Sequence, residues 1–539
     1  MPLFYLFTGR CQWLLLAALA GLGLLGSSCA RRHYFQPDAR VGTGSAQPLP
    51  ATADSVQATA GRHYNRHSGF YRLFLGRHYR RVWAAPVTVP VLSLATAAPG
   101  GLRPGKAGGG YQSISMTLEG CEGRAYALRA LDKEPSKTLP KVIRPTFVLN
   151  VVRDATSAAI PYGALTVPPL AQAAGVPHAC PRLVYVRQDE TGLGASSERF
   201  QGKLALLEEK YTTLASRTPD VAGAASFNGG EAMLNQVYLH AAHYIDQPAF
   251  LRARLLDVWL GDWDRHEGQW QWAEFREAGG RVRYLGIPKD RDQVYFRFDD
   301  GLIPWLAARR FIAPQFQTFR NAYNNIGGLV YQAQFIDQRG LSALTRADFR
   351  RTALELQRRL PDSVIERAMH RLPARVLALE GSRLGNALKA RRETLPQAAD
   401  AYYLTLARAP VLGGTAGAER FVVRRYSDST TVRVYSAVLG HLAGHDSLRF
   451  QRTYYRAETN LLTLDGLGGD DVFDVSTTAT RRPMRVRLYG GAGHDRLLLA
   501  GTSRRLARYD EAADLTAAGA HRPSRPRKKR RAYDRLNDD

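Results

Sequence analysis

The densest group of acidic and aromatic residues reads L-G-D-W-D-R-H-E-G-Q-W-Q-W at residues 260–272 and Y-L-G-I-P-K-D-R-D-Q-V-Y-F at residues 284–296. Acidic side chains packed among large apolar ones are costly unless a positive group binds them. A hard divalent cation that carries phosphates is one such group, and phosphoryl transfer uses the same carboxylates to orient a hydroxyl and to hold the metal. The alternative is a structural network in which Asp and Arg pair beneath the aromatic rings.

The flanking segments predict the fold around this group. Leu251, Leu255, Leu256 and Trp259 recur at the spacing of a buried helix face, and two short strands are expected after the polar loop. Upstream, residues 111–120 and 124–132 alternate apolar and polar residues and predict a β-hairpin, with two further strands at 182–187 and 203–211. Helical spacing returns at 343–410, and β patterns follow from about 419. We therefore expect an α+β protein.

The composition is that of a globular protein with a strong positive excess. The 539 residues are 45% hydrophobic and 23% charged, which is enough for two or three domains with real cores. The net charge of +26 favours anionic surroundings such as phosphate or lipid head groups, although general use of Arg by the genome is the simpler explanation. The basic, Pro-rich run at 522–531 is expected to be disordered.

The N-terminus has the pattern of an export signal. Arg10 is followed by a 14-residue apolar run at 13–26, which is too short to span a bilayer, and then by Ser27, Ser28 and Cys29. Small residues before a Cys resemble the lipobox of bacterial lipoproteins, which are acylated on that Cys. Because Ala30 rather than Asp follows, we expect an outer-membrane lipoprotein of the cell envelope, with either face open. Its expected partners are the membrane, through the lipid anchor, and an outer-membrane barrel protein or anionic lipid. No nucleic acid is expected. Whether Cys121 and Cys180 pair is left open.

The acidic segments resemble the atypical kinases, a group that includes HipA, the spore-coat CotH kinases, the secretory-pathway casein kinase and the phosphoinositide kinases. Asp264-Arg265-His266 is similar to their D-R-H loop, and Ile287-Pro288-Lys289-Asp290-Arg291-Asp292 to their metal-binding strand. The resemblance implies a bilobal kinase-like fold with a β-rich first lobe, a helical second lobe, and Mg²⁺ or Mn²⁺ with ATP or GTP as cofactors. It implies Asp264 as the catalytic base, and Gln269, in place of the usual Asn, with Asp290 and Asp292 as metal ligands. Phosphate contacts would come from Gly108, Gly109, Gly110, Arg129 (where kinases often carry Lys) and Lys133, and the L-L-E-E strand at 206–209 resembles the hinge strand of the adenine pocket.

Residues 105–500 also resemble a segment of large bacterial outer-membrane proteins often labelled metallophosphoesterase. In those proteins G-G-G-x-Q-T-K-S, V-L-R-S-V-D-K-D-P, G-D-W-D-R-H-E-D-Q-W and I-P-R-D-R-D-Q recur between a phosphoesterase domain and a β-barrel. The label does not transfer, because no G-D-x-x-D or G-N-H-[DE] follows the D-x-H of this chain, and a two-metal site would lack its other ligands.

A glycine- and aspartate-rich repeat marks the C-terminal part. The segments G-L-G-G-D-D-V-F at 466–473 and G-G-A-G-H-D-R-L at 490–497 are alike, and a fainter copy at 442–448 places the Asp residues at 446, 471 and 495. The pattern resembles calcium-binding β-rolls, which repeat at about nine residues. The longer step favours tight turns, with Ca²⁺ on Asp471 and Asp495 as the alternative. We expect a β-solenoid or β-sandwich.

Together these patterns predict a signal peptide at 1–28, a tether at 29–104, a kinase-like domain at 105–405, a Gly/Asp-repeat β domain at 406–510 and a basic tail at 511–539. Three hypotheses for function stay open. They are a nucleotide-using phosphotransferase, a non-catalytic, pseudokinase-like envelope scaffold or binding module, and a metal-dependent phosphohydrolase.

Overall fold

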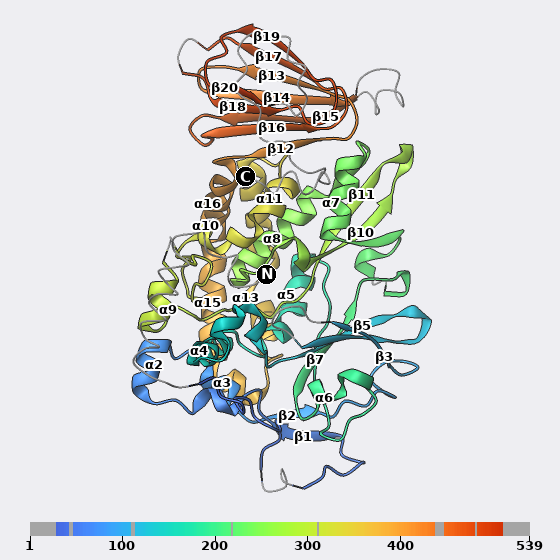
Figure 1. The fold of residues 1–539 in the computed structure, drawn as a ribbon, viewed down its shortest axis with the longest axis vertical. Coiled ribbons are helices and arrows are strands. Elements are labelled where there is room, and N and C mark those ends of the chain that lie inside the picture. Colours follow the sequence, from blue (N-terminus) through green and yellow to red (C-terminus); the bar gives the residue numbers. More distant parts are fainter. Residues whose placement is uncertain are drawn as a thin grey trace.

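The computed structural model describes residues 29–42, 47–108, 114–216, 219–309, 312–436, 447–479 and 482–509. The predicted signal peptide, Gly109, Gly110, Asp446 and the basic tail lie outside these ranges. The described chain is α+β, as predicted (Figure 1). No helix among the described residues has the length and apolar character needed to cross a membrane.

A five-stranded antiparallel sheet forms the first β layer, in the order β3-β4-β5-β7-β6. Its central hairpin joins β4 and β5 through a turn at Cys121–Gly123, where Glu122 and Gly123 take positive φ angles of 56° and 75°. The alternating apolar residues of β4, β5 and β7 face one buried cluster, so the predicted hairpin and strands are confirmed. The bounds are β3 Arg103–Gly108, β4 Ser115–Glu119, β5 Ala125–Ala130, β6 Arg182–Tyr185 and β7 Leu204–Lys210.

Residues 29–104, predicted as a tether, contribute buried side chains to two of the hydrophobic cores. They form the antiparallel pair β1 (Ser55–Ala58) and β2 (Val87–Pro90), and the helices α2 (Gly69–Leu75) and α3 (Arg80–Trp83). The segment is rich in Ala, Pro and Ser, as linkers are, but it also contains aromatic residues without a regular spacing. Those residues are buried in the largest hydrophobic cluster of the protein: Tyr34, Tyr64, Tyr79 and Trp83.

A second, four-stranded sheet carries the motif segments, in the order β8-β10-β11-β9. Strand β10 (Trp270–Arg276) pairs antiparallel with β11 (Val282–Pro288), and Trp270 and Trp272 both contact Phe250 of α8 (Gln247–Leu260). Helix α8 ends at Gly261, whose φ of 70° only glycine adopts readily. The predicted order of helix, loop and two strands is confirmed. The outer strands are β8 Ser226–Gly229 and β9 His243–Ile245, and α7 is Gly230–Leu239.

Helices surround α8 and complete the largest core, which includes the four predicted apolar residues of α8. Trp259 of α8 donates to the backbone oxygen of Leu388, and Arg391 donates to the backbone oxygens of Trp259 and Val258, so α15 is tied to α8. The longer helices are α4 Phe147–Asp154, α5 Val167–Ala174, α11 Gln334–Gly340, α12 Arg346–Arg359, α13 Asp362–Met369, α15 Ser382–Glu393 and α16 Leu395–Ala407. The short ones are α6 Ser197–Phe200, α9 Leu302–Ala307, α10 Ile326–Leu329 and α14 Ala374–Val376.

Two sheets form the C-terminal part, with strand orders β12-β16-β18-β20 and β15-β14-β13-β17-β19 (top of Figure 1). Leu461 pairs in parallel with Arg485 and Val472 with Arg496, which is the 24-residue step that also separates Asp471 from Asp495. The bounds are β12 Val411–Thr415, β13 Glu419–Arg425, β14 Ser429–Ser436, β15 Ser447–Tyr455, β16 Leu461–Leu467, β17 Val472–Thr477, β18 Arg485–Tyr489, β19 Arg496–Gly501 and β20 Leu506–Tyr509.

The described cysteines are exposed and free: Cys29, Cys121 and Cys180. The pairing of Cys121 with Cys180 that the sequence left open is therefore not formed in this structure.

Candidate functional site

Arg265 holds the loop between α8 and β10 in place. Its fully buried guanidinium donates to the backbone oxygens of Lys289, at 2.7 Å, and Gln269, at 3.0 Å, and lies 5.1 Å from the centre of the Trp270 ring. These contacts join the end of the loop to the end of β11. The middle residue of the D-R-H motif is therefore structural, and it brings Asp264 close to the segment that holds Asp290 and Asp292.

Part of the acidic group is neutralised by the protein itself. Arg291 donates to Asp257 and, at 3.1 Å, to Asp262, while Arg265 lies 3.5 Å from both carboxylates. Arg254 extends this network to Asp337, which it contacts at 2.7 Å. The guanidinium groups hold the pKa of Asp257 below its usual value although burial acts in the opposite direction. Asp257 and Asp262 thus form the structural ion-pair network that the sequence allowed as an alternative.

Asp264, Asp290 and Asp292 form a second acidic group with a different partner. The ammonium of Lys133 pairs with Asp292, and its pKa is raised because attraction to Asp292 and Asp290 exceeds the effect of burial. Burial, together with repulsion from Asp292 and Asp290, raises the pKa of Asp264 to about 6. Burial and Asp290 likewise raise the pKa of Asp292. These three carboxylates therefore carry more negative charge than Lys133 balances.

Asp290 lies where the backbone turns sharply after β11. Its φ of 54° is in the left-handed region, which a non-glycine residue adopts at a cost. Burial would raise its pKa, but Arg129, Lys133, Arg265 and Lys289 together lower it. The cations gathered around Asp290 make this end of β11 a place where positive and negative groups meet, which suits a phosphate bound together with a metal ion.

The first sheet presents its predicted phosphate-binding residues at the same edge. Gly108 pairs with Ser115, and Ser115 pairs with Arg129, so the end of β3 and the end of β5 lie in one row. Arg129 makes an ion pair with Glu208 of β7, inside the L-L-E-E strand. Lys133 follows β5 and reaches Asp292 of the second sheet. The structure thus brings the Gly108 end of the loop, Arg129 and Lys133 to the side that faces the acidic group.

Two predicted residues take backbone or local roles. The backbone oxygen of Gln269 accepts from the amide of Lys289, at 3.0 Å, and from Arg265, which fixes the strand pairing. His266 accepts from the amide of Gly268, at 3.1 Å, and its Nε2 lies 3.9 Å from Asp264. Burial lowers the pKa of His266, which favours a neutral ring at neutral pH. These contacts fix Gln269 through its backbone, and the assignment of its side chain as a metal ligand stays a prediction.

Lys289 is a site residue that sequence reasoning named only as part of the I-P-K-D-R-D segment. Burial and then repulsion from Arg129 lower its pKa to about 8. The sequence contained a signal for this role. Lys289 directly precedes the carboxylate of Asp290 at the end of a predicted buried strand, where a Lys side chain has little room to reach solvent.

The repeat aspartates build a hydrogen-bonded ladder. Asp471 accepts from the backbone amide of Glu419, at 2.8 Å, and Asp495 accepts from the amide of Asp471, at 3.0 Å. Burial, with repulsion from Glu419 and Asp495, raises the pKa of Asp471 to about 9. Each carboxylate therefore links one strand turn to the turn of the neighbouring repeat, as expected of turn-building residues.

A ready-made metal cluster is not present in the part of the chain that the structure describes, where no three His, Cys, Asp or Glu side chains gather in metal-binding geometry. Mg²⁺ usually keeps several waters and is held by one or two carboxylates together with substrate phosphates. Asp264 fits that mode, because burial and repulsion from Asp292 and Asp290 raise its pKa, and Asp292 would fit it once Lys133 and Gln293 release its two oxygens. In the repeat, one oxygen of Asp471 and one of Asp495 accept from backbone amides, and Ca²⁺ on these two residues stays a prediction.

The comparisons with known proteins include a distant structural likeness. No family model matches the chain, and no curated protein matches it. Among solved structures, HipA of Shewanella oneidensis MR-1, in a complex with HipB and operator DNA, aligns at a TM-score of 0.27 and 11% identity over 55% of this chain and 68% of that one. A match at this level does not establish a shared fold or activity.

Proposed function

We propose that the chain binds a divalent cation with a nucleotide and acts as a divergent, kinase-like phosphotransferase of the cell envelope. One observation supports this above the others. Lys133, which follows β5 of the first sheet, pairs with Asp292 beside Asp264 and Asp290, at the sheet edge where Gly108 and Arg129 lie. Burial and mutual repulsion raise the pKa values of Asp264 and Asp292 although Lys133 lies beside them, and a phosphate-bound cation would relieve that repulsion.

Each residue has a distinct proposed task. Asp264, whose pKa is raised to about 6, would accept the proton of an acceptor hydroxyl, since a base with a pKa near the working pH transfers protons well. Asp290 and Asp292 would hold Mg²⁺ or Mn²⁺, which when bound neutralises phosphate charge. Lys133 would then release Asp292 and contact a phosphate. Arg129 and the predicted phosphate-binding glycines at 108–110 would position the remaining phosphate oxygens.

We also propose the finer architecture that the sequence predicts. Residues 105–405 would form the bilobal unit, with the first sheet as the β-rich lobe and the helices around α8 as the second. The 24-residue step of parallel pairing supports a β-solenoid for the C-terminal sheets. The exposed Cys29, which follows Gly26, Ser27 and Ser28, fits a lipid anchor, and hence an outer-membrane lipoprotein.

A non-catalytic binding module is the second candidate, and one observation favours it. Lys133 is already paired with Asp292, and Arg129 with Glu208, so the phosphate-facing cations have partners within the protein. In this case the same fold would bind a partner without turnover.

Titration calorimetry with Mn²⁺ and ATP or GTP tests the proposal on the wild type and on Asp292→Asn. We expect the wild type to bind the pair and the variant to bind it roughly 10- to 100-fold more weakly, as is usual when a metal site is disturbed. The matched control is Asp474→Asn, which removes an ion-paired carboxylate from the β sheets. Equal affinity of wild type and Asp292→Asn, or no binding, would favour the second candidate. Release of phosphate from simple phosphomonoesters without nucleotide would favour a hydrolase instead.

A further inference from the structure

Two short helices carry matching rows of apolar side chains, most of which are exposed. On α2 the row is Phe70, Leu73 and Phe74, and on α9 it is Leu302, Trp305 and Leu306. Both rows follow the i, i+3, i+4 spacing that places side chains on one helix face. Phe70 is 74% exposed and Leu73 65%, and Trp305 and Leu306 are 46% and 56% exposed. Large apolar groups gathered at the surface of a soluble domain mark an interaction site.

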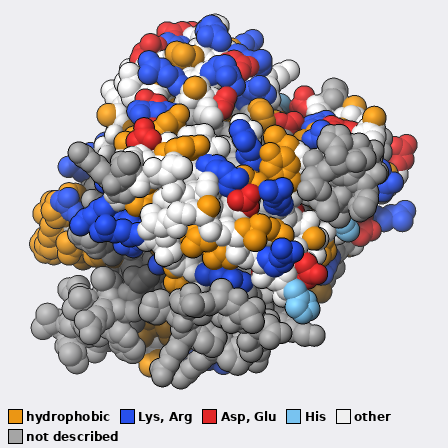
Figure 2. Space-filling view, turned by 90° about the horizontal axis from the view of Figure 1, so that it is seen from above, with side chains coloured by type: hydrophobic (Ala, Val, Ile, Leu, Met, Phe, Trp, Pro, Cys, Tyr) orange, Lys and Arg blue, Asp and Glu red, His pale blue; other side chains and the backbone are white. Residues whose placement is uncertain are grey.

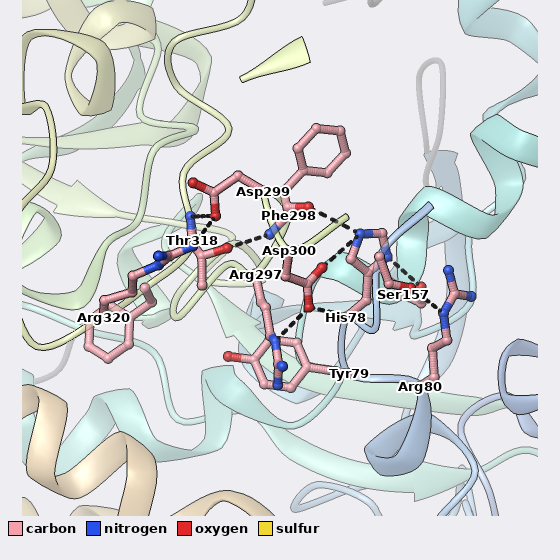
Figure 3. A network of polar contacts seen from close by, with 12 residues as sticks. His78, Tyr79, Arg80, Ser157, Arg297, Phe298, Asp299, Asp300, Thr318 and Arg320 are labelled. Atoms are coloured by element: carbon pink, nitrogen blue, oxygen red, sulfur yellow. Dashed lines mark hydrogen bonds and ion pairs between the residues drawn. The ribbon is translucent and has the colours of Figure 1, made fainter. Parts of the chain in front are cut away.

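The two helices are held together by a buried polar network (Figure 3). Asp300 accepts from the amide of His78, at 2.8 Å, and from Arg297, at 2.9 Å, while the ring of His78 contacts Ser157 at 3.0 Å. Burial lowers the pKa of His78 to about 4, so the ring is neutral at physiological pH. Gly301 lies against the backbone of Gly76, where an added Cβ would collide. The end of α2 and the start of α9 are thus fixed to each other.

The surroundings of the two rows are basic. Arg66 and Arg77 flank α2 and are exposed, and Arg309 lies over the Trp305 ring, 3.5 Å from its centre. Residues 66–77 and 302–309 contain no Asp or Glu. At the left edge of Figure 2, the side on which α2 and α9 lie in Figure 1, hydrophobic side chains stand at the surface beside Lys and Arg. An apolar face with three exposed arginines beside it complements an anionic surface.

The predicted lipid-bearing Cys29 lies near this face. Its backbone pairs with Thr146 at the start of α4, and the amide of Arg31 donates to Asn150 on the same helix. Asp154, at the other end of α4, pairs with His67 at 3.1 Å, and the His67 ring stacks on Tyr71 of α2. Helix α4, whose eight residues span ~12 Å, therefore connects the segment that holds Cys29 to the segment that holds α2. Residues 29–33 and 137–145 are also free of acidic residues and include the exposed Val142.

We propose that the face formed by α2 and α9 docks on an anionic lipid bilayer beside the acylated Cys29. The apolar rows would enter the interface between head groups and acyl chains, with Trp305 at the boundary, where tryptophan is favoured. Arg66, Arg77 and Arg309 would contact the head groups. This inference depends on the envelope location proposed above and is independent of phosphoryl transfer. It orients the protein on the membrane instead of leaving it on a loose tether.

Tryptophan fluorescence in vesicles with brominated acyl chains tests the docking. Trp305 is the exposed tryptophan among the described residues, since Trp83, Trp259, Trp270 and Trp272 are buried and Trp263 packs against Phe296 and Phe316. The acylated full chain is reconstituted in phosphatidylethanolamine with phosphatidylglycerol. We expect the brominated acyl chains to quench the tryptophan emission of the wild type, and we expect this quenching to be lost in Trp305→Phe. Quenching should fall in Leu306→Ser and be unchanged in Leu498→Ser, whose Leu is 45% exposed on β19. It should also fall without phosphatidylglycerol.

Equal quenching of the wild type and Trp305→Phe would overturn the docking. Absence of quenching in the wild type, together with dimerisation through the face formed by α2 and α9, would also overturn it. The intact mass of the purified chain reports acylation separately. If no acyl groups are found, the location proposal fails. Flotation of the unacylated chain with the same vesicles then tests whether the face formed by α2 and α9 binds the bilayer without a lipid anchor. There, Leu306→Ser should weaken vesicle binding by roughly tenfold, the factor for one buried Leu, and no binding of the wild type would contradict the inference.

Discussion

Asp264 is the side chain whose ionisation couples stability to the proposed chemistry. Its pKa in the folded protein is about 6, above the usual 3.8, so the folded state binds the proton more tightly than the unfolded state does. The resulting stabilisation is present below about pH 4 and is lost as the pH rises through 6. Asp264→Asn should therefore raise the unfolding free energy at pH 7.5 by about 3 kcal/mol, with little change at pH 4. Thermal unfolding across this pH range measures it, and a less stable variant at pH 7.5 would contradict the repulsion among the three carboxylates.

Arg265 should matter for folding rather than for binding. Arg265→Met removes the donor to two backbone oxygens and leaves Asp262 with less compensation, which costs ~3–5 kcal/mol for a buried pair. The matched control is Arg276→Met, because the Arg276 side chain is 79% exposed. Urea unfolding of the two variants gives the comparison. A similar small loss in both would show that the network is not structural.

Secondary structure was predictable wherever one periodicity dominated. Helix α8 and the β4–β5 hairpin followed from apolar spacing, because each element buries one face. The acidic motif was predicted as a single group, yet the structure divides it, since sequence spacing does not show which Asp an Arg will reach. Asp262 pairs with the guanidinium groups of Arg291 and Arg265, whereas Asp264, two residues later, belongs to the acidic group around Lys133. The core role of Tyr34 and Tyr64 was missed because isolated aromatic residues in an Ala- and Pro-rich segment have no periodicity.

The hydrogen-bonded ladder of Asp471 and Asp495 predicts that substitution by Ala destabilises the protein at Gly466 and not at Gly468. A Cβ at Gly466 would collide with the Asp471 carboxylate, whereas the nearest atom to a Cβ at Gly468 is the Ala492 oxygen at 3.6 Å. Gly466→Ala should lower the unfolding free energy by about 1–3 kcal/mol, and Gly468→Ala should change it by no more than about 0.5. Denaturant unfolding followed by circular dichroism distinguishes them. Equal tolerance would mean that the Asp471 ladder does not set the turn.

At the scale of the whole molecule, the N-terminal segment 29–104 is part of the folded protein. Tyr34, Ala39, Ala58 and Tyr64 are buried in the largest core, together with residues of α8 and α16. Deletion of residues 30–61 should therefore abolish cooperative unfolding, because it removes core side chains rather than a linker. Differential scanning calorimetry checks this. A sharp transition at an unchanged temperature would restore the tether interpretation.

The most direct test of the proposed phosphotransferase site is the position of a bound metal. Crystals grown with Mn²⁺ and a non-hydrolysable ATP analogue, measured at the manganese absorption edge, locate the ion by its anomalous signal. We expect a peak between Asp290 and Asp292, with the Lys133 ammonium moved from Asp292 to a phosphate oxygen. Nucleotide and metal bound elsewhere on the protein, with the pair of Lys133 and Asp292 intact, would contradict the proposed site.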